Sequence, residues 1–171
     1  DRADLLANLM IDLRPDTVVM IGDGWDMASL ASYDKGKRSF FGKSYKKDIE
    51  AGLDFQARMW EPVKATKKRL PETYFFIGNH EERIDRALDL SPELVGTVGY
   101  KDLQLSRWYD EIIPDDGGTP GVKVIEGIAF AHFFVAGVLG RAISGEHQAY
   151  TLLTKNFQSC IHFNTHTLDF C

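Results

Sequence analysis

The sequence predicts a mixed α/β fold. Strand-like and helix-like segments alternate over the first half of the chain, whereas the last third contains a hairpin-like segment and short strand-like segments around one expected helix. Strands that alternate with helices build parallel sheets, and hairpins add antiparallel strands. The alternation and the closing hairpins together predict a mixed sheet, not a purely doubly wound one.

The first elements follow clear patterns. Leucine and methionine recur at three- and four-residue spacing in residues 5–13, which predicts an amphipathic helix. Residues 17–21 are uniformly apolar, as strands of parallel sheets are. A Gly- and Lys-rich loop, residues 23–45, comes next, and loops of this length are usually functional or mobile. Residues 46–70 predict a long helix that Pro62 kinks or breaks.

The later elements are shorter. Residues 73–77 predict a second apolar strand, and helical sequence continues to about residue 90, where Ser91-Pro92-Glu93 starts another short helix. The remaining segments are a loop at 115–121, a hairpin at 122–132, a helix at 145–157, and short strands at 159–162 and 167–170.

Composition limits the possible classes of protein. The chain has 171 residues, 44% of them hydrophobic and 26% charged, which is enough for one globular domain over residues 1–171. Its net charge of -5 does not favour non-specific binding to nucleic acid or anionic membranes, and no apolar run is long enough to span a bilayer. Cys160 and Cys171 form no CxxC pattern, so we expect reduced thiols and a cytoplasmic protein. Because the chain starts without methionine and stops in a strand-like segment, we expect it to be a segment of a longer domain or a processed chain.

Polar side chains follow the apolar runs at the points where each run ends. These candidate residues are Asp23, Asp26, Asn79, His80, His132, Asn164 and His166. Sites in open α/β sheets form at the carboxyl ends of strands, so one sheet could bring them together. Carboxylate, amide and imidazole groups suit Mn²⁺, Fe or Zn²⁺, and two such ions bridged by a carboxylate can hold a phosphoryl group. Taken singly, Asp23 and Asn79 could instead cap turns, and His132 could be a hydrogen-bonded core histidine.

In chain order, these residues form a recognisable series of motifs. Gly22-Asp23-x-x-Asp26, Gly78-Asn79-His80-Glu81, a strand-end His132 and a terminal His166 together resemble the calcineurin-like metallophosphoesterases. The resemblance spans nearly the whole chain. Ser32-Tyr33-Asp34-Lys35-Gly36 and the tail from His166 to Phe170 resemble the phage-encoded branch of that family, which would place the protein in a host cytoplasm.

The resemblance implies a mixed-sheet α/β/β/α sandwich, incomplete at both ends, with two divalent ions (Mn, Fe or Zn) at the strand ends. Asp23 would bridge both ions, Asn79 and His132 would bind the second ion, and His166 would bind the first. His80 would be the catalytic residue that stabilises charge or donates a proton at the scissile phosphate. Glu81 would tie the turn together, and Asp26 would support the site.

The chain departs from the family pattern at two places. The opening Asp-x-His motif is absent, so the first metal site lacks two ligands from this chain. The closing Gly-His-x-His motif is replaced by Phe163-Asn164-Thr165-His166. Asn164 is therefore expected to offer an amide oxygen to the second ion, and His162 is an alternative ligand because it would share the same strand face.

The loop at residues 36–44 has glycines, lysines and a serine, but it is not a nucleotide-binding P-loop. Five residues separate Gly36 from Gly42, whereas the motif requires four. Arg38 and Lys43 remain candidates for substrate binding, because cations interleaved with aromatic residues are typical of loops that hold nucleic-acid strands. The alternative is a solvated lysine-rich loop.

These observations predict a metal-dependent phosphoesterase that hydrolyses a phosphomono- or phosphodiester of a nucleotide or nucleic acid, with no membrane partner. One alternative is a non-catalytic, phosphoesterase-like binding or assembly module with a degraded metal site, which would self-associate through an exposed sheet edge. A further alternative is a single-metal enzyme that retains only the second site.

Overall fold

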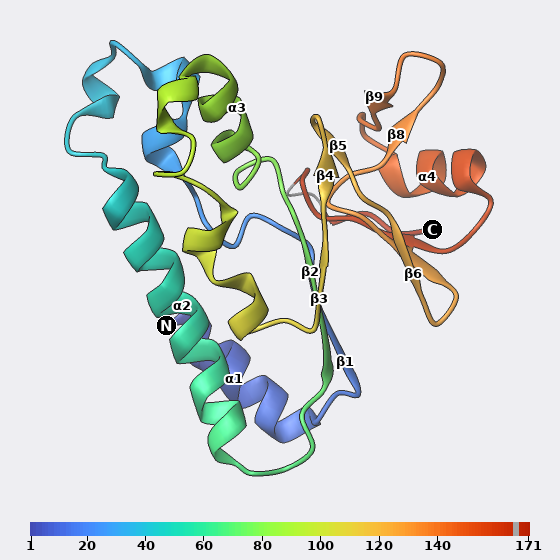
Figure 1. Cartoon of the computed structure of the whole chain (residues 1–171). Helices are drawn as coiled ribbons and strands as arrows, with labels where there is room; N and C mark the ends of the chain where they lie inside the picture. The colour runs from blue at the N-terminus through green and yellow to red at the C-terminus, as the bar shows by residue number, and fades with distance from the viewer. Residues whose placement is uncertain (166–167) are drawn as a thin grey trace.

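The computed structural model describes residues 1–165 and 168–171 and shows a mixed α/β protein with several small sheets (Figure 1). This confirms the general α/β class. The helices are α1 (Arg2–Leu13), α2 (Tyr45–Ala65), α3 (Arg83–Leu90) and α4 (Gln148–Asn156). Short 3₁₀ turns are η1 (Ala28–Leu30), η2 (Ser32–Asp34), η3 (Arg38–Phe40), η4 (Pro92–Leu94), η5 (Tyr100–Leu103) and η6 (Leu105–Arg107).

The first sheet is parallel and has the order β1-β2-β3, with β1 (Thr17–Met20), β2 (Glu72–Phe76) and β3 (Glu111–Ile113). Its two faces are both covered, as parallel sheets require. Phe75 points into a core with Met59 and Trp60 of α2 and with residues of α1. Its neighbours Tyr74 and Phe76 point to the opposite face, because side chains alternate along a strand.

The second sheet has the order β10-β7-β6, built from β6 (Lys123–Ile125), β7 (Ile128–Phe130) and β10 (Cys160–Ile161). Ile125 and Phe130 pack against Tyr74 and Phe76 of the first sheet. The opposite side of the second sheet packs on Leu152 of α4, so the two sheets lie between α1–α2 and α4 (Figure 1). Two small hairpins complete the strands: β4 (Asp115–Asp116) with β5 (Thr119–Pro120), and β8 (Val135–Ala136) with β9 (Arg141–Ala142).

Several elements differ from the sequence-based expectations. Helix α2 ends at Ala65, not at residue 70, and Pro62 lies inside it. The loop at 115–121 contains the β4–β5 hairpin, and strand β3 was not expected. Residues 168–171 form no strand, and residues 166–167 lie outside the described part of the chain. None of the helices among the described residues is long and apolar enough to cross a membrane.

The buried indole of Trp25 lies between α2 and the rest of the loop that follows β1. Trp25 is 1% exposed and stacks edge-on against Phe75. Helix α2 can approach it because residue 52 is glycine: a Cβ there would overlap the pyrrole ring of Trp25. The glycine therefore sets how closely α2 packs over the loop that carries Asp23 and Asp26.

Gly52→Ala should destabilise the protein, although alanine favours helices over glycine by about 1 kcal/mol. The overlap with Trp25 should outweigh this gain and leave a net loss of about 1–3 kcal/mol, as overpacked cores show. Urea unfolding measures the change. In a Trp25→Leu background the same substitution should become stabilising, and equal costs in both backgrounds would contradict the packing argument.

Candidate metal centre

Two sharp turns bring the ends of β1 and β2 into contact. Gly22 has φ 86° and Asp23 has φ 55°, a left-handed conformation that aspartate tolerates better than most residues. A Cβ at position 22 would lie 2.7 Å from His132 Nδ1 and 2.8 Å from the Gly78 Cα. The absence of a side chain at Gly22 therefore lets three distant segments meet at one point.

Glu81 ties these turns together from inside the protein. Its side chain is fully buried, and its carboxylate accepts hydrogen bonds from the backbone N–H groups of Asp23 (3.0 Å), Trp25 (2.9 Å) and Gly78 (2.9 Å). Burial raises the pKa of Glu81 to about 7, and the three N–H donors oppose that rise. One carboxylate thus fixes both the loop after β1 and the loop after β2.

Three oxygen and nitrogen atoms converge beside these turns. His132 Nε2 lies 2.8 Å from Asn79 Oδ1 and 3.5 Å from Asp23 Oδ1. The other ring nitrogen, Nδ1, lies 2.6 Å from the carbonyl oxygen of Ile21 and must be its donor, since a carbonyl only accepts. With its proton on Nδ1, a neutral ring has its Nε2 lone pair directed at the two oxygens, which is the form in which histidine binds metals.

The two separations from His132 Nε2 suit ligands of one divalent ion. Ligands bound at about 2.1 Å to a common ion lie roughly 3 Å from one another, close to the separations seen here. A neutral His132 and the Asn79 oxygen are both acceptors, and a shared cation would explain their close approach. Among the described residues, no group of three or more His, Cys, Asp or Glu side chains could hold a metal ion. The donor set found here has an amide as its third member.

His80 lies beside this cluster and is oriented by Asp26. The His80 Nδ1 is 3.0 Å from Asp26 Oδ1, and its Nε2 is 4.0 Å from Asp23 Oδ2. Its backbone N–H donates to Asp23 Oδ1 at 3.1 Å. Arg83 holds Asp26 in turn, because its Nη1 donates to the Asp26 carbonyl oxygen at 2.6 Å. His80 therefore has one nitrogen engaged and the other facing the cluster.

A cavity of about 830 Å³ opens in front of the cluster. It is lined by Asp23, His132 and Asn164, and it runs along β1 between α1 and α2. The backbone N–H of Asn164 donates to the His132 carbonyl oxygen at 3.3 Å, which brings the closing segment beside the cluster. Phe163, 70% exposed, also lines this cavity.

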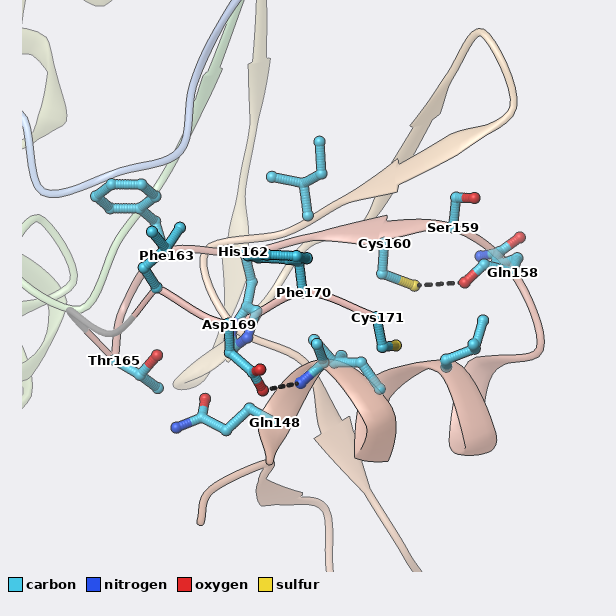
Figure 2. Close-up of a pocket in the computed structure, with 15 residues that line it drawn as sticks. Gln148, Gln158, Ser159, Cys160, His162, Phe163, Thr165, Asp169, Phe170 and Cys171 are labelled. Atoms are coloured by element: carbon cyan, nitrogen blue, oxygen red, sulfur yellow. Dashed lines mark hydrogen bonds between the residues drawn. The ribbon is translucent and has the colours of Figure 1, made fainter. Parts of the chain in front are cut away.

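The other predicted site residues lie elsewhere. His166 is outside the described residues. His162 lies in a separate pocket beside α4, with Gln148 and Asp169, and not in the cavity that Asn164 lines (Figure 2). The alternative that His162 replaces Asn164 as a ligand is therefore not supported. Lys43 is paired with Asp34, whereas Arg38 is exposed on the loop surface.

Two arginines that sequence reasoning did not select also support the site. Arg83, only 7% exposed, holds Asp26, and Arg86 donates to the Asn79 carbonyl oxygen at 2.9 Å. Their three-residue spacing at the start of α3 puts both on the face next to the turns. That spacing, directly after Gly-Asn-His-Glu, was the available signal.

Comparisons of this chain with protein-family models, with curated proteins and with solved structures found no match.

Replacing Asn164 with histidine, together with Phe163→Gly, should raise the affinity for Mn²⁺. An imidazole is a better ligand for these ions than an amide oxygen, and glycine would let the segment turn towards His132. We expect a gain of about tenfold, which equals ~1.4 kcal/mol. Calorimetric titration measures it. No gain would show that residue 164 does not reach the ion.

Proposed function

We propose that the protein is a metal-dependent phosphoesterase of the calcineurin-like type. The observation that carries this proposal is the convergence of Asp23, Asn79 and His132, from three separate segments, beside His80. These are the residues to which the sequence resemblance assigns metal binding and catalysis.

The arrangement of layers supports the same proposal. Helices α1 and α2, the two sheets and α4 follow one another in the order that the family's α/β/β/α sandwich has. The candidate centre lies where β1, β2 and β7 end. Open α/β sheets bind their ligands at the carboxyl ends of strands.

In this proposal, one group of residues binds the ions and His80 transfers a proton. Asp23, Asn79 and His132 would hold the second ion, with Asn164 beside them, and Asp23 would be shared with a first ion. The ions would supply Lewis-acid catalysis and activation of water. Asp26 holds His80 Nδ1, so a doubly protonated His80 would have its Nε2–H free to donate to the leaving oxygen of the ester.

A second candidate function rests on Phe163. This large, exposed side chain lines the cavity in front of the cluster at a position where the family has a glycine. A side chain of this size would limit access of an ester to the ions. The protein would then be a phosphoesterase-like binding or assembly module without turnover. Strand β1 is an outer strand of its sheet, which leaves the predicted self-association through that edge open to test.

Hydrolysis of bis(4-nitrophenyl) phosphate decides between the two functions. With Mn²⁺ we expect release of nitrophenolate that EDTA abolishes and excess Mn²⁺ restores. Turnover that EDTA does not change would contradict a metal-dependent enzyme. No turnover by a folded sample with Mn²⁺, Fe²⁺ or Zn²⁺ would favour the non-catalytic module.

A further inference from the structure

The segment between η2 and the first turn of α2 concentrates positive charge. Residues 35–47 contain six lysines and arginines and no acidic residue. The remaining residues carry 14 basic and 25 acidic side chains, so the positive charge of this segment stands against an acidic background. Such a local field attracts polyanions even when the overall charge is negative.

Five of these six cations are exposed, and the side chains of three of the five make no hydrogen bond or ion pair with another described residue. Lys43 is paired with Asp34, Lys46 lies 3.7 Å from Glu50, and Lys47 reaches the Gly42 carbonyl oxygen. In contrast, the exposed cations just before η3 and at its start make no such contact. These are Lys35, Lys37 and Arg38. The Lys37 ammonium lies 6.0 Å from the centre of the Tyr33 ring.

Two aromatic rings stand beside these cations without being buried. Phe41 is 94% exposed and Tyr33 is 62% exposed. Packing within the protein does not account for a phenylalanine in this position. Exposed rings among cations provide stacking surfaces for bases next to contacts for phosphates.

The surface continues towards the candidate metal centre. A groove of about 320 Å³ lies between residues 30–35 and α3, and it is lined by Tyr33, Lys35, Arg83 and Arg86, with Asp89 at one side. The Arg83 guanidinium lies 5.7 Å from the centre of the Tyr33 ring. As described above, the two arginines also bond to the carbonyl oxygens of Asp26 and Asn79. Figure 1 shows this segment at the N-terminal end of α2, next to α3.

We infer that the groove and residues 35–47 form a binding surface for a single-stranded oligonucleotide. Tyr33 and Phe41 stack on bases, Lys35, Lys37 and Arg38 contact phosphates, and the strand leads past Arg86 to Asn79. The inference names the substrate class of the proposed phosphoesterase and rests on that function for the cleavage step only. A duplex fits less well, because its bases are already stacked on one another.

Binding can be tested without cleavage. Fluorescence anisotropy of labelled dT₁₂ is measured with the full chain in EDTA, over a range of salt concentrations. The triple substitution Lys35→Ala, Lys37→Ala, Arg38→Ala should raise the Kd at least about tenfold and make the salt slope shallower by about 2, since each phosphate contact with a single strand contributes roughly 0.7. Phe41→Ala should weaken binding about tenfold through lost stacking.

The chain offers matched controls. Lys67→Ala, Lys68→Ala, Arg69→Ala removes the same charge from exposed positions beyond the other end of α2, about 30 Å away along the helix. Phe157→Ala removes a ring that is 86% exposed near α4. Both controls should bind dT₁₂ like the wild type. Equal weakening by the control triple, no effect of Phe41→Ala, or no binding of dT₁₂ by the wild type at 50 mM salt would each overturn the inference.

The outcome is separate from that of the proposed function. Binding of dT₁₂ in EDTA together with no hydrolysis of the aryl diester would support the oligonucleotide surface and contradict the enzyme. Chelator-sensitive hydrolysis without dT₁₂ binding would support the enzyme and overturn the oligonucleotide surface.

Discussion

Asp23→Asn should abolish metal-dependent phosphoester hydrolysis while leaving the protein folded. The substitution removes the negative charge that the ions require but keeps the size of the side chain. Asparagine also tolerates the left-handed backbone at this position and can still accept the hydrogen bond from the His80 N–H. Mutating residues that only support metal ligands lowers metal affinity or activity about 10- to 100-fold. For a direct ligand such as Asp23 we therefore expect activity to fall at least about 100-fold.

Steady-state turnover with saturating Mn²⁺ measures this loss, and circular dichroism checks the fold. Asp54→Asn is the matched control, because Asp54 is an exposed residue of α2 whose side chain is 68% accessible. The control should keep full activity. Equal activity of Asp23→Asn and the wild type would contradict the assignment of Asp23 as a metal ligand.

Glu81→Gln should lower the free energy of unfolding more than any other single substitution at this site. The Glu81 carboxylate accepts three backbone N–H bonds in a fully buried position. A glutamine has one oxygen, so its NH₂ group would face at least one N–H donor. Hydrogen bonds to charged groups contribute about 1.5–3 kcal/mol, and an unpaired buried donor adds to the cost, so we expect a loss of about 3 kcal/mol.

Urea unfolding at pH 8 measures this change, because the Glu81 carboxyl, with its pKa of about 7, is then ionised. Glu82→Gln is the control: the neighbouring Glu82 is also buried but is paired with a single side chain, Arg86, so it should lose only about 1 kcal/mol, the contribution of one hydrogen bond. If both variants unfolded at the same urea concentration, the three backbone bonds would not hold the two turns together.

Strands β1 and β2 and the hairpin at 123–130 were predictable from sequence because local patterns determine them. Apolar runs that end at Gly22 and Gly78 define β1 and β2, and the six residues of β6 and β7 flank a Glu-Gly turn. Strand β3 was not predictable, because its three residues become a strand only by pairing with β2. Tertiary context, not local preference, forms such short strands.

The burial of α1 could not be predicted from its periodicity. Its leucines form an apolar stripe, yet Leu5 and Leu13 are 67% and 69% exposed, whereas the small Ala3 and Ala7 are buried. Small residues let α1 approach α2 closely, and the sequence pattern alone cannot reveal that preference. Within the site, the grouping of Asp23, Asn79 and His132 was predictable from the strand ends. Arg83 and Arg86 act through backbone carbonyls, so the sequence signalled them only by their spacing directly after Gly-Asn-His-Glu.

A calorimetric titration with Mn²⁺ is the decisive test of the candidate metal centre, because it requires no knowledge of the substrate. We expect saturable binding by the wild type that Asn79→Ala and His132→Gln each weaken at least about tenfold. His147→Gln, which changes an exposed histidine at the start of α4, should bind like the wild type. Binding that is unchanged in Asn79→Ala and His132→Gln, or no binding by the folded wild type, would contradict the metal centre.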